Sequence, residues 1–162
     1  MDITTVLNKI EEASRDFYRE SDVQVGKLKV TIGILGADEE SSIQDYLSSE
    51  VKMAFIYKMK LETVVRSIRA IDGFRIDNLE FFETGEVIDG VPVKVERLKY
   101  IRDLVGKWGQ AIIDRLFMAY AELASALERD INPDKTEQEL VQELMAQAQV
   151  AQAATELMEE QQ

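Results

Sequence analysis

The side chains that could carry chemistry in this sequence are Asp, Glu, Lys, Tyr and Ser, because the chain has no histidine and no cysteine. Histidine is the usual general base near neutral pH and the commonest transition-metal ligand. Cysteine supplies thiolate nucleophiles, disulfides and soft metal ligands. Catalysis would therefore rest on carboxylates, lysine, tyrosine or a hard metal ion. We predict a binding protein with no enzymatic activity, no cofactor and no metal site.

Three short stretches resemble ligand motifs without completing them. "GILGADEE" (residues 33–40) has two glycines after a predicted strand, but it lacks the spacing and the lysine of a phosphate-binding loop. "DGFRIDN" (residues 72–78) lacks the ordered Asp/Asn positions and the closing Glu of a calcium loop. The acids Asp38 to Glu40 fit the solvated first turn of a helix better than a metal site.

The charge balance limits the partners. With 31 acidic and 19 basic residues the net charge is -12, which argues against nucleic acid and against an anionic membrane surface. The sequence contains no run of about 18 apolar residues that would cross a bilayer. The beginning, "MDITTVLNKIEE", is charged and periodic, unlike a signal peptide.

Five basic residues gather within the predicted central helix. A solvated helix face is the simpler interpretation, and a local patch that docks an acidic segment is the alternative. The sequence leaves both open. These residues are Lys52, Lys58, Lys60, Arg66 and Arg69.

The least polar part of the chain is "RDLVGKWGQAIIDRLFMAYAELASAL" (residues 102–127), which holds the only tryptophan. A helix predicted from Gln110 to Arg129 has two adjacent apolar stripes, wider than a helix packed on one side requires. It is either central in its own bundle or covers a groove between molecules. The candidate partner-binding residues here are Trp108, Ile112, Phe117 and Met118.

The last 31 residues differ in composition from the rest. "NPDK" (residues 132–135) marks a boundary, after which the chain has no aromatic residue and no glycine. Residues 132–162 carry seven acids and one lysine, a net -6, which leaves -6 for residues 1–131. Apolar positions recur at steps of three and four, as in a helical seam. The seam comprises Val141, Leu144, Ala148, Ala151, Thr155 and Met158.

This tail is either a frayed extension or a segment that becomes ordered on a partner helix. Its candidate partner-binding residues are Val141, Leu144, Met145 and Met158.

Periodicity predicts the elements that would position these residues. Residues 3–18 form a helix with one buried stripe and Asp2 or Thr4 as its cap, and residues 28–34 form a half-buried strand after a turn or bulge at Gly26. Helical spacing runs from Asp38 to Ala70, with a break near Ser48 to Glu50 and Gly73 ending the helix.

The next signals are a hairpin and a divided helix. Asp89-Gly90 lies between two β-prone arms, and Pro92 places one arm at an edge. Helical spacing returns from Val95 to Trp108, where Gly106 and Gly109 split or kink the chain. The predicted fold is α+β and predominantly helical, with four or five helices, a small antiparallel sheet or hairpins, and a C-terminal tail helix. We assign residues 1–131 to one domain and residues 132–162 to the tail.

The order of these elements resembles the tail assembly chaperones of tailed bacteriophages, which chaperone the tape measure or the baseplate hub. The likeness covers about Val23 to Arg129 and lies in the layout, in "IRAIDG" and in "W…DRLF…YAEL". It implies a small, acidic, mostly helical, non-enzymatic protein in the cytoplasm of the infected host. The N-terminal helix is longer than the family pattern, which leaves the branch of the family open.

From this resemblance we expect the chain to bind an apolar helical segment of the tape measure or hub, with the tail helix closing over it. Self-association is a further option. The alternative function is a structural virion component, such as a neck or baseplate adaptor.

Overall fold

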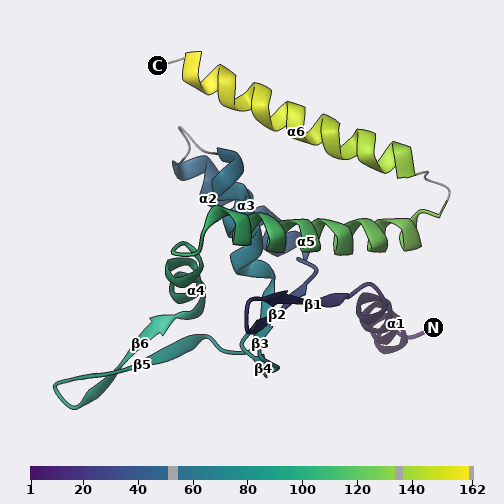
Figure 1. Cartoon of the computed structure of the whole chain (residues 1–162). Coiled ribbons are helices and arrows are strands. Elements are labelled where there is room, and N and C mark those ends of the chain that lie inside the picture. Colours follow the sequence, from purple (N-terminus) through teal and green to yellow (C-terminus); the bar gives the residue numbers. More distant parts are fainter. Residues whose placement is uncertain (51–54, 134–136, 161–162) are drawn as a thin grey trace.

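A computed structural model describes residues 1–50, 55–133 and 137–160 (Figure 1). The predicted fold class is confirmed: 61% of the structure is helical, with small antiparallel sheets and a C-terminal helix. The helices within the described residues are α1 (Ile3–Asp16), α2 (Ala37–Glu50), α3 (Phe55–Ser67), α4 (Arg97–Val105), α5 (Gln110–Ile131) and α6 (Glu137–Glu160). The strands are β1 (Glu20–Val25), β2 (Leu28–Gly33), β3 (Ile68–Ile71), β4 (Phe74–Arg75), β5 (Phe81–Ile88) and β6 (Val91–Glu96).

The larger sheet is antiparallel, in the order β1-β2-β3-β4. Val23 pairs with Val30, so both side chains lie on the face that meets α3 and α5. On the opposite face the Thr31 hydroxyl donates to Asp22 at 2.6 Å. The predicted half-buried alternation is not seen in β2: its first two residues are both partly buried, and its last four, from Val30 to Gly33, are all buried.

The main core lies between this sheet and the helices α3, α4 and α5. α5, the green helix in the middle of Figure 1, packs against β1 and β2. Ile113 and Leu116 of α5 have no exposed surface, and neither does Val64 of α3. The buried members of the core are Val23, Val30, Ile32, Val64, Val65, Ile68, Ile76, Ile101, Val105, Ile113 and Leu116.

A second cluster lies where α2 meets α3. Leu35, Ile43 and Leu47 are buried there, and Tyr120 of α5 links them to the main core. At the start of α2 the Gly36 amide donates to Glu39 Oε2 at 2.9 Å, the reciprocal half of a capping box.

The prediction of helix as far as Ala70 is wrong. α3 ends at Ser67, and Ile68–Ile71 forms strand β3, in which Ile71 pairs with Val30. Leu61, Val64, Ile68 and Ile71 follow helical spacing, but β3 fills an interior place in the sheet, and ladder hydrogen bonds there outweigh local preference. The predicted break near Ser48 to Glu50 falls on the last residues of α2, which ends at Glu50, and positions 51 to 54 are outside the described residues.

The prediction that Gly73 ends a helix is wrong. Asp72 and Gly73 both have positive φ, 49° and 81°, and form the two-residue turn between β3 and β4. A type I′ turn needs positive φ at both positions, and Asp-Gly is among its preferred pairs. Gly26, with φ 61°, opens the turn between β1 and β2, so the predicted turn at Gly26 is confirmed.

The β5–β6 hairpin is confirmed, with Asp89 and Gly90 at its turn. It forms a two-stranded ribbon of its own that projects away from the rest of the chain (Figure 1). Val95 belongs to β6 rather than to the following helix, which begins at Arg97. The break at Gly106 and Gly109 is confirmed, because α4 ends before the first glycine and α5 begins after the second.

The N-terminal helix forms as predicted, but its stripe is not buried. The Thr5 amide donates to Asp2 Oδ1 at 2.9 Å, which confirms Asp2 as the cap. No residue of α1 is buried, and Ile3, Leu7 and Ile10 are exposed. Periodicity showed which face is apolar, but no other element of the described chain packs on that face.

Candidate partner-binding surfaces

The apolar stretch around Trp108 divides between the core and the surface. Trp108, Ile112 and Phe117 are half-buried and pack against the main core. α5 contacts α3, β1 and β2. The tertiary structure therefore favours the first of the two alternatives, a helix central in its own bundle.

Met118 is the exception, with 57% of its side chain exposed. It lies in a groove of about 360 Å³ between α5 and β1. Because β1 is the first strand of the sheet, this groove follows an open edge. Its other lining residues are Ser21, Asp22, Val23, Gln24, Arg115, Ala119 and Glu122.

The tail helix α6 presents an uncovered apolar surface. It shares no packed interface with any other element of the described chain, and Figure 1 shows it as a separate yellow helix that turns back after α5. None of its described side chains is buried, and Leu144 is 51% exposed. The predicted residues Val141, Leu144, Met145 and Met158 are all exposed.

Two further apolar surfaces were not predicted as partner sites. One is the stripe of α1, which the sequence placed in the core. The other is the tip of the β5–β6 ribbon, where Val87, Ile88 and Val91 are exposed beside the Asp89-Gly90 turn. The Asp89-Gly90 pair predicts the turn correctly. The alternation of apolar and polar residues in a two-stranded ribbon, however, does not indicate whether another element covers either face.

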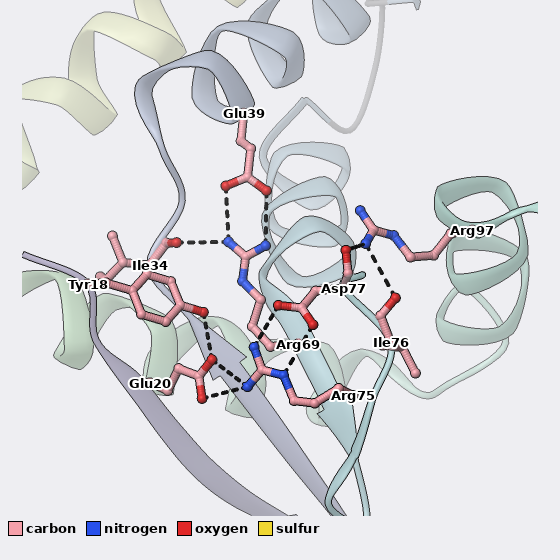
Figure 2. A network of polar contacts seen from close by, with 9 residues as sticks. All are labelled: Tyr18, Glu20, Ile34, Glu39, Arg69, Arg75, Ile76, Asp77 and Arg97. Atoms are coloured by element: carbon pink, nitrogen blue, oxygen red, sulfur yellow. Dashed lines mark hydrogen bonds and ion pairs between the residues drawn. The ribbon is translucent and has the colours of Figure 1, made fainter. Parts of the chain in front are cut away.

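A network of polar contacts around Arg69 fixes α2 against the sheet (Figure 2). The Arg69 guanidinium donates to both carboxylate oxygens of Glu39, at 3.1 and 3.0 Å, and to the carbonyl of Ile34 at 2.8 Å. Burial alone would lower the pKa of Arg69, but the hydrogen bonds with Glu39 raise it above its usual value. This bidentate pair is structural, and it uses the most buried of the three acids that begin α2.

The same network joins the end of α1 to strands β1 and β4. The Tyr18 hydroxyl donates to Glu20 at 2.6 Å, and Arg75 donates to Glu20 at 2.6 Å and to Asp77 at 2.6 Å (Figure 2). Partial burial, followed by the hydrogen bond to Glu20, raises the pKa of Tyr18 to about 12. Arg97 of α4 donates to the carbonyl of Asp77 and so ties the ribbon's root to the same place.

A buried carboxylate joins α3 to α4. Glu62 is 1% exposed and accepts hydrogen bonds from Arg102, while Arg66 Nε lies 3.4 Å from its second oxygen. The Arg102 guanidinium lies 4.8 Å from the centre of the Tyr46 ring. The hydrogen bond to Glu62 is the main cause of the raised pKa of Arg102.

The predicted basic cluster is therefore largely neutralised within the fold. Arg66 pairs with Glu62 and Arg69 pairs with Glu39. Lys60 lies 2.8 Å from Asp114 and 5.7 Å from the centre of the Phe117 ring. Lys52 lies outside the described residues. Neither the solvated face nor the docking patch describes Arg66 and Arg69, because both are held by carboxylates of their own fold.

Within the described ranges, no three Asp or Glu side chains come together in a way that could hold a metal ion. No helix of the same ranges is long and apolar enough to cross a membrane. The described chain exposes apolar side chains at the groove at Met118, on the stripe of α1, at the tip of the ribbon and along the seam of α6.

Comparison with known proteins does not assign the chain to a family. No protein-family model matches it, and neither a curated protein nor a solved structure gave a match.

Proposed function

We propose that this protein is a tail assembly chaperone of the kind made by tailed bacteriophages, and that it binds an apolar helical segment of the tape measure or baseplate hub. The observation that carries the proposal is the uncovered seam of α6, a helix of 24 residues with no packed interface to the described remainder. At about 1.5 Å per residue such a helix is roughly 36 Å long, enough to bind several turns of a partner. The protein acts by binding and not by catalysis.

We propose that the client binds to α6 rather than to the surface around Trp108. Trp108, Ile112 and Phe117 already pack on the core, so a client could reach them only by displacing part of the fold. Val141, Leu144 and Met158 need no such displacement. Met145 borders the seam, and Met118 offers a smaller secondary contact.

Apolar burial supplies the affinity, at about 25 cal/mol for each Å² removed from water. The middle of the α6 seam consists of Ala148, Ala151 and Thr155, so it buries little area per turn. The stripe of α1 offers a second uncovered apolar face on the same chain. A client that contacts both helices would bind more tightly than a client that contacts one, because the two apolar contacts add to the same affinity.

Co-expression with candidate tail proteins tests the proposal. We expect the full chain to raise the soluble fraction of its client, and Val141→Gln/Leu144→Gln/Met158→Gln to lose most of that effect. Glutamine keeps helix propensity while removing apolar surface. Val150→Gln/Leu157→Gln is the matched control, since both residues are exposed on the opposite side of α6.

Two results would contradict the proposal. One is a client whose solubility is unchanged by the seam variant and by removal of residues 132–162. The other is the presence of the protein at fixed stoichiometry in purified virions, measured by mass spectrometry, which would indicate a neck or baseplate adaptor instead.

A further inference from the structure

We propose that the helix bound by the α6 seam is a basic amphipathic helix from a different protein, with Lys or Arg beside a stripe of large apolar side chains. This inference rests on the proposed function and specifies the chemistry of the partner.

α6 is itself strongly acidic. The helix Glu137–Glu160 contains six glutamates and no lysine or arginine. No base follows Lys135 to the end of the sequence. In paired helices the charges that flank an apolar seam select the partner and its orientation. A partner with basic flanks is the one that this helix favours.

The protein's own surfaces carry the same sign of charge as α6. Residues 1–131 carry a net charge of -6, and a second copy carries -12, so each would bring like charge to α6. The body's buried cations are also committed, because Arg69 pairs with Glu39 and Arg66 and Arg102 both pair with Glu62. Like-charge surfaces oppose association, whereas complementary ones steer it.

The side chains of the α6 seam differ in size along the helix. Large apolar side chains lie towards its two ends, at Leu144 and Met158, while Ala148, Ala151 and Thr155 fill the middle. Small residues allow close approach of a second helix but bury little area themselves. The partner must therefore supply the large side chains opposite the middle of α6.

Three fluorescein-labelled peptides test the inference on the full chain. The first is an amphipathic Leu/Lys helix of 21 residues, the second its Leu/Glu counterpart, and the third a shuffled Leu/Lys sequence without a stripe (about six turns each). We expect the Leu/Lys helix to bind at least tenfold more tightly than either control at about 0.05 M salt. The preference should shrink at 0.5 M salt, where charges are screened over a few ångströms.

Variants then locate the binding. Val141→Gln/Leu144→Gln/Met158→Gln should weaken Leu/Lys binding at least tenfold, and Val150→Gln/Leu157→Gln should leave it within twofold. Glu156→Gln/Glu159→Gln/Glu160→Gln should weaken it at least threefold. The control for lost charge is Glu80→Gln/Glu83→Gln/Glu86→Gln, which removes three acids near or on the ribbon and should change the affinity less than twofold.

The remaining outcomes separate a failure of this inference from a failure of the proposed chaperone function. Equal binding of the Leu/Glu helix would show that charge does not select the partner, while leaving the proposed chaperone function intact. Equal loss from the seam and the control variants would place the site elsewhere. A dimer in sedimentation velocity that the seam variant dissolves would make a second copy the occupant. Tight Leu/Lys binding with no effect on any tail protein would sustain the basic partner and contradict the chaperone function.

Discussion

Arg19 and Asp130 join the beginning of the fold to the end of α5: Arg19 Nη2 lies 3.4 Å from Asp130 Oδ2. Arg19 directly precedes β1, and Asp130 is in the last turn of α5. α1 and α6 therefore leave from the same end of α5 (Figure 1). The two helices whose apolar stripes are uncovered share one anchoring point, although 120 residues of sequence separate the end of the first from the start of the second.

Glu62 should be needed for stability. Glu62→Gln leaves Arg102 and Arg66 without their carboxylate in a buried place, and we expect the free energy of unfolding to fall by about 3 kcal/mol. Urea denaturation measures the change. Glu83→Gln, at an exposed site, should alter it by no more than about 0.5 kcal/mol. Equal effects of the two substitutions would show that Glu62 is solvated.

The core and the α1 stripe should respond differently to truncation. Ile113→Ala creates a cavity at a residue with 0% exposure, and it should lower the free energy of unfolding by about 2–5 kcal/mol. Ile10→Ala, on exposed α1, should change the free energy of unfolding by no more than about 0.5 kcal/mol. Thermal or urea denaturation compares them. A large loss from Ile10→Ala would mean that α1 is covered in solution.

The β3–β4 turn should depend on left-handed backbone. Gly73 has φ 81°, where a side chain costs about 1–2 kcal/mol, so Gly73→Ala should lower the free energy of unfolding by that amount. Gly73→Asn should recover much of the loss, because asparagine visits this region more readily. Space is not the cause, since an added Cβ would meet nothing within 4 Å. Equal stability of the two variants would contradict the assignment of the turn.

Alkaline pH should weaken the contact between Tyr18 and Glu20. The pKa of Tyr18 is raised from 10.0 to about 12, so the neutral phenol is favoured in the folded state. The contribution of the neutral Tyr18 phenol to the stability of the fold is complete below pH 10 and is lost as the pH rises towards 12. We expect Tyr18→Phe to flatten part of the fall in stability over that range, as measured by urea denaturation at successive pH values. Tyr100→Phe is the comparison, and an identical pH profile for both variants would disprove the prediction.

Local sequence determined the elements whose signals act over a few residues. Asp2 begins α1 because its carboxylate accepts the Thr5 amide, and Asp89-Gly90 closes a hairpin because both residues reach positive φ. Gly106 and Gly109 separate α4 from α5 as predicted. The seam of α6 could likewise be predicted from spacing alone, because α6 shares no packed interface with the rest of the described chain that would override its periodicity.

Only the tertiary structure decided the rest. Ile68–Ile71 has helical spacing, yet it forms a strand because β2, nearly forty residues earlier, offers it a ladder of hydrogen bonds. The apolar faces of α1 and α5 look equally suited to a core, but α5 lies across the sheet and α1 does not. Spacing defines which face of a helix is apolar. Whether that face is buried depends on which elements, distant in sequence, pack against it. Here the main core packs against Trp108, whereas Leu144 stays exposed.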